Sequence, residues 1–163
     1  MEIGIIVHSQ TGHTLSVAQK LKERFVAAGH TVSLEQVKAI DDSQTEVRKI
    51  QLSEKPDVSS YDILILGAPV RGFSLSPVMA AYLSNGISLS GKKLGCFVTQ
   101  SFPYPWMGGK QAIEQMKKLC ESKGATVCES GIVNWSSKKR EKKIDETVEN
   151  LTKAVGKPNK IAE

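Results

Sequence analysis

A repeated alternation of short apolar runs and stretches of helical spacing constrains the fold of this chain more than any other feature. The first run, residues 3–7, is continuously apolar, which is typical of a strand buried on both faces of a parallel sheet. Apolar residues then recur at helical spacing from Leu15 to Ala28, and Gly29 stands where a C-terminal cap belongs. The start of the chain is therefore predicted to form a strand, a loop and a helix.

The same alternation continues along the chain. Further strands are expected over residues 31–37, 62–66, 93–99 and 126–133, and further helices over 77–83, 110–123 and 138–155. The polar segment 38–60 is expected to be a long connection with one helical turn near residues 46–50. There is no repeat and no internal linker. This order predicts one α/β domain over residues 1–163, with a doubly wound, five-stranded parallel sheet between two helical layers.

The composition excludes several classes of protein. With 40% hydrophobic and 24% charged residues, the chain differs from disordered and fibrous sequences. No apolar run approaches the roughly 20 residues that span a bilayer. The first ten residues also carry an acidic residue where a signal peptide would carry basic ones. We therefore expect a cytoplasmic protein without a membrane span.

The three cysteines show no CxxC spacing and form an odd set, which argues against a metal site or a disulfide framework. Cys96 and Cys128 fall within expected strands, so we expect both to be core residues.

The net charge of +5 comes largely from the segment KKREKK, residues 138–143. A solvated helix start is the simplest interpretation of this run. A nucleic-acid site would interleave aromatic or base-reading residues with the charge, and none occur there, so no nucleic-acid partner is expected. An acidic partner and an anionic ligand are both compatible with this charge.

The loop after the first strand has the chemistry of a receptor for a single phosphate. Residues 8–14 read HSQTGHT and open directly into a helix, so hydroxyls and backbone N–H groups converge where the helix dipole favours an anion. Gly12 allows a close approach of the backbone. The GxxxxGK and GxGxxG spacings are missing, which weakens triphosphate and dinucleotide interpretations. An ordinary hydroxyl-capped turn is the alternative.

At these residues the chain resembles the flavodoxin family, whose FMN phosphate loop has the form S/T-x-T-G-x-T. The element order is similar over nearly the whole chain. The resemblance implies FMN as cofactor, the sheet order 2-1-3-4-5, and electron transfer with no catalytic side chain and no metal. The phosphate-loop residues that it places at the cofactor are Ser9, Gln10, Thr11, Gly12, His13 and Thr14.

The loop over residues 67–73, GAPVRGF, is similar to the segment that borders the isoalloxazine ring, particularly in the NAD(P)H:quinone reductase branch of the superfamily. Its backbone would contact the flavin N5 edge, and Arg71 near the N1–C2 side would favour anionic reduced flavin. A surface arginine beside a tight turn is the alternative. The residues expected at the cofactor are Ala68, Pro69, Val70, Arg71, Gly72 and Phe73.

The loop over residues 99–109 is dense in aromatic residues, prolines and glycines. Aromatic rings can stack on a flat heterocycle, and prolines lower the entropy cost of ordering a loop. Either aromatic ring, Tyr104 or Trp106, could stack on the flavin or pack locally to hold the loop together. The residues that the resemblance places at the cofactor are Thr99, Gln100, Ser101, Tyr104, Trp106, Gly108 and Gly109.

Three functions are compatible with these residues. The first is an FMN electron carrier, although the chain lacks the acidic flavin-side loops and the negative charge that are typical of such carriers. The second is an NAD(P)H-dependent FMN quinone reductase, favoured by GAPVRG and the basic surface. The third is a non-redox module that binds a phosphorylated ligand or a partner. Expected partners are a redox protein or a small quinone with NAD(P)H, and the chain is expected to be a monomer or a weak homodimer.

Overall fold

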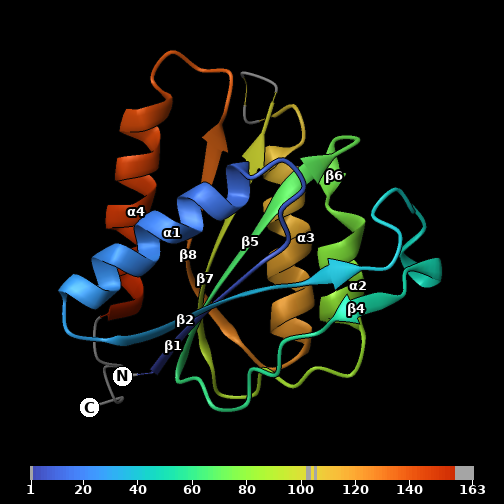
Figure 1. Ribbon diagram of the computed structural model, residues 1–163, viewed down its shortest axis with the longest axis horizontal. Coiled ribbons are helices and arrows are strands. Elements are labelled where there is room, and N and C mark those ends of the chain that lie inside the picture. The colour runs from blue at the N-terminus through green and yellow to red at the C-terminus, as the bar shows by residue number, and fades with distance from the viewer. Residues whose placement is uncertain (1, 102–103, 105, 157–163) are drawn as a thin grey trace.

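The computed structural model describes residues 2–101, 104 and 106–156 (Figure 1). Five long strands form a parallel sheet in the order β2-β1-β5-β7-β8. Their bounds are Glu2–Val7 for β1, Thr31–Gln36 for β2, Ile63–Arg71 for β5, Lys93–Gln100 for β7 and Thr126–Asn134 for β8. Numbered among themselves, these strands have the order 2-1-3-4-5, which confirms the expected topology.

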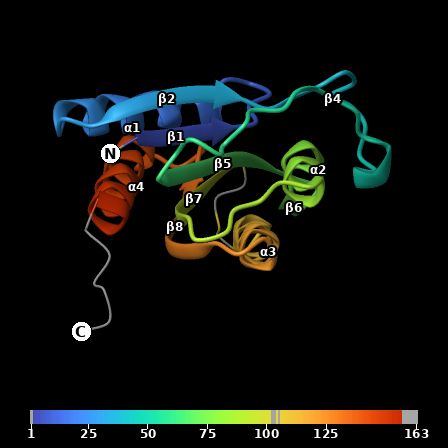
Figure 2. The same ribbon diagram turned by 90° about the horizontal axis from the view of Figure 1, so that it is seen from below.

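Helices cover both faces of this sheet (Figure 2). One face packs against α1, His13–Ala27, and α4, Arg140–Gly156. The other face packs against α2, Pro77–Ser84, and α3, Gly109–Ser122. The three-layer architecture is therefore the doubly wound α/β fold that the alternation predicts.

The central strands are buried on both faces, which explains their continuous apolar runs. In β5, Ile63 and Ile65 pack on the side of α1 and α4, while Leu64 and Leu66 pack on the side of α2 and α3. Each side has its own hydrophobic core because side chains alternate between the two faces along a strand. Burial from both sides then holds the carboxyl ends of β1, β5 and β7 in fixed positions.

The third strand is longer than expected. β5 continues to Arg71, and its last residues pair antiparallel with β6, Ser74–Leu75, through a turn in which Gly72 and Phe73 have φ of 55° and 63°. Most of the segment expected as a loop over residues 67–73 is therefore strand. The reason is tertiary, because pairing with β7 extends as far as Pro69 opposite Thr99.

The long connection contains a small antiparallel hairpin that the sequence did not predict. Its strands are β3, Lys38–Ala39, and β4, Leu52–Glu54, and the expected helical turn is a 3₁₀ turn, Val47–Lys49. Strands of two and three residues are too short to leave a periodic pattern.

The prediction for the cysteines is half right. Cys96 is buried, but Cys128 is exposed. The strand that carries Cys128, β8, is at the edge of the sheet, where the first residues alternate between exposed and half-buried. Within the described ranges, no helix is long and apolar enough to cross a bilayer.

Candidate functional site

A cavity of about 100 Å³ lies where the carboxyl ends of β1, β5 and β7 meet, at the upper end of the sheet in Figure 1. In an open α/β sheet this edge is the usual ligand site, because the direction of the crossovers reverses there. The fold thus brings residues of all three expected loops to one place. The lining residues are Gln10, Thr11, His13, Pro69, Val70, Thr99, Gln100 and Ser101.

The start of α1 forms one wall of this cavity. Gly12 adopts a left-handed conformation with φ of 88° at the N-cap position of α1, where a glycine has no side chain that could cap the helix. Ser9 Oγ accepts a hydrogen bond from the N–H of Leu15 at 3.3 Å, which draws the loop over the helix end. Among the residues that the structure describes, no acceptor is bonded to the N–H groups of Gly12 and His13. These donors suit an anion that satisfies the helix start.

Thr14 ties the helix start to the third strand of the site. Its hydroxyl lies 2.9 Å from the hydroxyl of Thr99, and both side chains are buried. The Thr14 hydroxyl is therefore used within the protein, while Thr11 is exposed and lines the cavity. Thr14 orders the site, whereas Thr11 is available to a ligand.

His8 was not among the predicted site residues, yet it organises the wall between the first two loops. The ring is buried, with Nδ1 2.6 Å from Ser76 Oγ and Nε2 2.9 Å from Asp42 Oδ1. A carboxylate accepts at Nε2, so Nε2 carries the hydrogen and Nδ1 accepts from the Ser76 hydroxyl. Burial lowers the pKa of His8 despite the bond to Asp42. The available signal in the sequence was a histidine directly after the first expected strand.

Asp42 connects three segments around the same wall. Its carboxylate accepts from Gln10 Nε2 at 2.9 Å as well as from His8, and its backbone carbonyl accepts from Arg71 at 2.8 Å. Burial raises the pKa of Asp42, but the hydrogen bonds from Gln10 and His8 outweigh it, and the pKa lies below its ordinary value. Sequence reasoning missed Asp42 because the residue belongs to the unpredicted hairpin region.

The contact with Asp42 also defines the position of Arg71. Its guanidinium is engaged with the Asp42 carbonyl at the rim of the site. The placement of this cation beside the N1–C2 side of a flavin stays a prediction.

The third loop is shaped by contacts between its own residues. Gln100 Nε2 donates to the Tyr104 carbonyl at 2.6 Å, and the Tyr104 and Trp106 rings stack at a centroid distance of 5.6 Å and 4° between planes. Both rings are exposed and neither lines the cavity, which corresponds to the local-packing alternative. Stacking of either ring on a bound flavin stays a prediction. Phe102, Pro103 and Pro105 lie outside the described residues.

Glycines at the end of this loop permit close packing against the second loop. At Gly108, where φ is 112°, a Cβ would lie 2.6 Å from Val70 Cγ1 and 2.8 Å from the Cα of Phe73. At Gly109 a Cβ would lie 2.4 Å from Gln100 Oε1. Only glycine allows the two loops to approach this closely. The residues therefore position the site and present no side chain to it.

A second group of residues joins the site from the end of β8. His13 stacks on Trp135 at 4.0 Å and 11°, and Arg140 lies over the same indole with its Cζ 4.8 Å from the ring centroid. Desolvation and the charge of Arg140 both lower the pKa of His13. Trp135 and Arg140 were missed because nothing local in the sequence connects them to residues 8–14.

Comparison with known proteins places this geometry in a family. The family model described as flavodoxin matches residues 5–154. No curated protein matches the chain.

Solved structures show the same fold. Oxidised flavodoxin 1 from Bacillus cereus is 18% identical, with a TM-score of 0.73, and the match covers 98% of this chain and 100% of that chain. A flavoprotein in complex with FMN from Lactobacillus acidophilus NCFM is 15% identical, with a TM-score of 0.61 and coverage of 90% and 97%. The two-electron reduced flavodoxin of Megasphaera elsdenii is 25% identical, with a TM-score of 0.59 and coverage of 91% and 98%.

Proposed function

This chain belongs to the flavodoxin family, whose members bind FMN and transfer electrons, and we propose that its FMN lies at the carboxyl ends of β1, β5 and β7. The observation that carries the proposal is the cavity lined by residues of all three loops, beside the start of α1, where the N–H groups of Gly12 and His13 have no bonded acceptor among the described residues. When bound, FMN supplies redox chemistry that no side chain can perform. The protein binds and orients the cofactor and sets its environment.

The donors at the start of α1 fit the phosphate of FMN. They are the hydroxyls of Ser9 and Thr11 and the N–H groups of Gly12 and His13, with space around Gly12 that a Cβ would not fill. Among the described residues, no carboxylate lines the cavity. Neutral donors at a helix N-terminus hold a phosphate through charge-assisted hydrogen bonds and the helix dipole. We assign this wall to the phosphate.

The remaining walls fit a flat ring. Pro69 and Val70 line one side and Thr99, Gln100 and Ser101 another, so backbone and short side chains of β5 and β7 border the cavity. Because β5 pairs with β7 and the buried Thr14–Thr99 pair is hydrogen-bonded, the ring would be held by strands that the protein's own contacts order. Preorganisation of this kind lowers the entropy cost of binding.

Titration of the apoprotein with FMN and with riboflavin tests the assignment. FMN is expected to bind stoichiometrically, and its fluorescence should be quenched on binding. Riboflavin, which lacks the phosphate, should bind at least tenfold more weakly. Thr11→Val should lower FMN affinity by about tenfold, one charge-assisted hydrogen bond, and leave riboflavin affinity unchanged. Thr126→Val, an exposed threonine at the start of β8, is the matched control. Equal affinities for FMN and riboflavin would exclude the phosphate assignment.

Anaerobic reduction of the loaded protein then tests the redox role. Two resolved spectral transitions are expected for a one-electron carrier. A single transition, together with NADPH oxidation by a benzoquinone above the rate of free FMN, would assign the chain to the quinone reductases instead.

A further inference from the structure

We propose that the carboxyl edge of this chain docks an acidic redox-partner protein. Two adjoining surfaces would form the contact. The basic patch consists of Lys138, Lys139, Lys142 and Lys143, and the aromatic patch consists of Phe73, Tyr104 and Trp106. The inference rests on the proposed function, because it places the partner beside the FMN.

The lysines of the basic patch are exposed and have no acidic partner among the residues that the structure describes. Elsewhere in the chain several lysines do have one, as in Lys20 with Glu141 at 2.9 Å and Lys153 with Glu149 at 2.9 Å. Lys139, Lys142 and Lys143 also line one surface hollow of about 290 Å³, together with Glu146. Positive charge therefore outnumbers negative charge in this hollow and is gathered at one place.

Helix stability does not explain this gathering. Lys142 and Lys143 lie in the first turn of α4, where the positive end of the helix dipole disfavours cations. A negatively charged surface placed there would interact favourably with the lysines and with the dipole together. An acidic partner thus converts an unfavourable arrangement into a favourable one.

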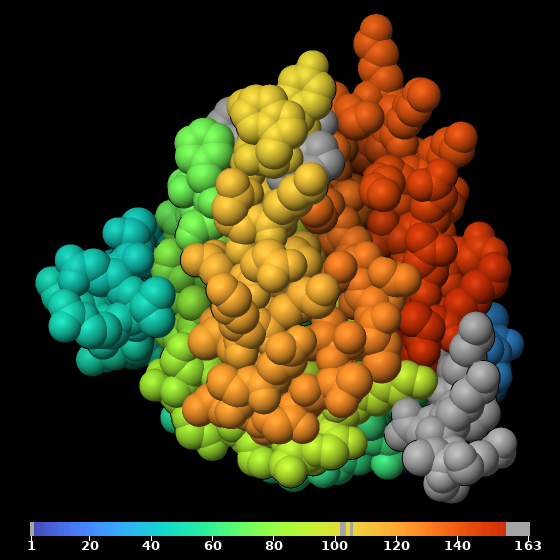
Figure 3. All heavy atoms as spheres, turned by 180° about the vertical axis from the view of Figure 1, so that it is seen from behind, coloured from blue at the N-terminus to red at the C-terminus, as the bar shows by residue number. Residues whose placement is uncertain are grey.

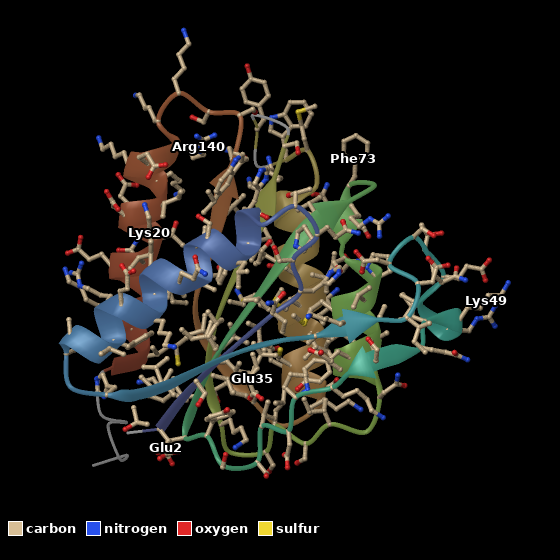
Figure 4. All side chains as sticks on the ribbon, viewed as in Figure 1. Glu2, Lys20, Glu35, Lys49, Phe73 and Arg140 are labelled. Atoms are coloured by element: carbon tan, nitrogen blue, oxygen red, sulfur yellow. The ribbon has the colours of Figure 1, made fainter. Side chains whose placement is uncertain are left out.

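The aromatic patch lies at the same end of the molecule. Phe73, Tyr104 and Trp106 are 52%, 55% and 63% exposed, and no other large aromatic side chain is exposed in the described ranges. Figure 3 shows aromatic rings at the upper edge beside the start of α4, and Figure 4 labels Phe73 and Arg140 at that end. Phe73 has φ of 63°, a conformation that costs energy in a non-glycine residue, at the tip of the β5–β6 turn.

The combination has the composition of a protein interface. Interfaces are enriched in aromatic residues, while charges on the rim steer association and set its rate. Over residues 99–111 and 134–143 the sequence has six cations and one acidic residue. A single-stranded nucleic acid also combines phosphate charge with stacking. We favour a protein because the two patches flank the proposed FMN site, where a partner must sit to exchange an electron.

The test uses FMN-loaded protein and a plant-type [2Fe–2S] ferredoxin of net negative charge as the probe. In the reaction one electron leaves the reduced cluster, which is oxidised, and reduces the FMN by one electron. Stopped-flow absorbance gives its rate, and calorimetry gives the affinity without electron transfer. Raising the ionic strength from about 50 to 500 mM should slow the reaction at least tenfold, because salt screens charge attraction.

Two variants of equal net charge separate a local patch from an overall field. Lys139→Glu/Lys142→Glu/Lys143→Glu should lower the association rate constant at least tenfold and weaken calorimetric binding similarly. The control, Lys22→Glu/Lys55→Glu/Lys118→Glu, alters exposed lysines outside the basic patch and should change both by less than twofold. Glutamate at a helix start is favourable, so the patch variant is expected to fold, as circular dichroism would verify.

Several outcomes would overturn the proposal. If both variants lost rate and affinity equally, net charge alone would explain the binding. If neither variant lost rate or affinity, the basic patch would have no part in docking. Tighter binding of a single-stranded oligonucleotide than of ferredoxin would identify a nucleic-acid surface. Failure of FMN to bind would refute the proposed function alone, because ferredoxin binding to the apoprotein would still be measured by calorimetry.

Discussion

His8 and Asp42 are joined by a hydrogen bond of 2.9 Å between Nε2 and Oδ1, across 34 positions of the chain. The bond ties the end of β1 to the segment that follows β3, and Ser76 holds the other ring nitrogen at 2.6 Å. Ser76 also accepts from the Met79 N–H as the N-cap of α2. One buried imidazole therefore connects three elements that border the candidate site.

The free energy of unfolding is expected to decrease as the pH is lowered from neutral to mildly acidic, in part because His8 takes up a proton. Burial holds its folded pKa below 6.5, the ordinary value, so the unfolded chain binds the proton more readily. The contribution of His8 to the free energy of unfolding is fully present above about pH 6.5 and is lost as the pH falls through the folded pKa. His8→Gln should flatten this slope in urea titrations at several pH values.

His13 contributes to the same slope, because its pKa is also lowered. NMR titration of the ring protons gives the pKa of each histidine in the folded protein, and so the contribution of each to the pH dependence of stability. A His8 pKa at or above 6.5 in the folded protein would contradict this account.

The Thr14–Thr99 pair should behave as a unit. Thr14→Val leaves the buried Thr99 hydroxyl without its partner, at a cost of about 1–3 kcal/mol in the free energy of unfolding, and Thr99→Val does the same to Thr14. The double variant is expected to cost much less than the sum, since no hydroxyl is then left unpaired. Denaturant unfolding of all four proteins checks this, and simple additivity would show that the hydroxyls do not interact.

Gly108→Ala should be far more damaging than Gly86→Ala. Both glycines have positive φ, which costs another residue about 1–2 kcal/mol, but a Cβ at Gly86 meets no atom within 4 Å. At Gly108 it meets Val70 and the backbone of Phe73, adding about 1–3 kcal/mol of overpacking. Thermal unfolding measures the difference, and FMN affinity should drop only for Gly108→Ala. Equal costs would mean that the two loops separate easily.

Arg140→Gln should raise the pKa of His13. The guanidinium is the second cause of its lowered value after desolvation, so removing the charge leaves the desolvation in place and gives a partial return toward 6.5. The His13 ring protons report the change by NMR in the apoprotein. An unchanged pKa would mean that Arg140 acts on Trp135 alone, through the ring contact and its bond to the Trp135 carbonyl.

The local signals in the sequence were sufficient for the architecture and for the first loop. Continuous apolar runs such as residues 3–7 arise because a central strand is covered on both faces, and the element order then limits the topology. The hydroxyls and Gly12 directly before a helix were enough to predict a phosphate-type wall, because all its donors come from one short segment. Local patterns suffice where the structure itself is local.

Tertiary structure decided what depends on residues far apart in the chain. β5 extends through Arg71 because β7 and β6 pair with it, and Cys128 is exposed because β8 is at the edge of the sheet. His8 reaches Asp42, and His13 reaches Trp135, only because the crossovers bring distant segments to one edge. By itself the sequence determined the sheet and the first loop, through short-range periodicity. Folding determined the side-chain partners, because hydrogen bonds and ring contacts depend on distances in space that sequence spacing does not encode.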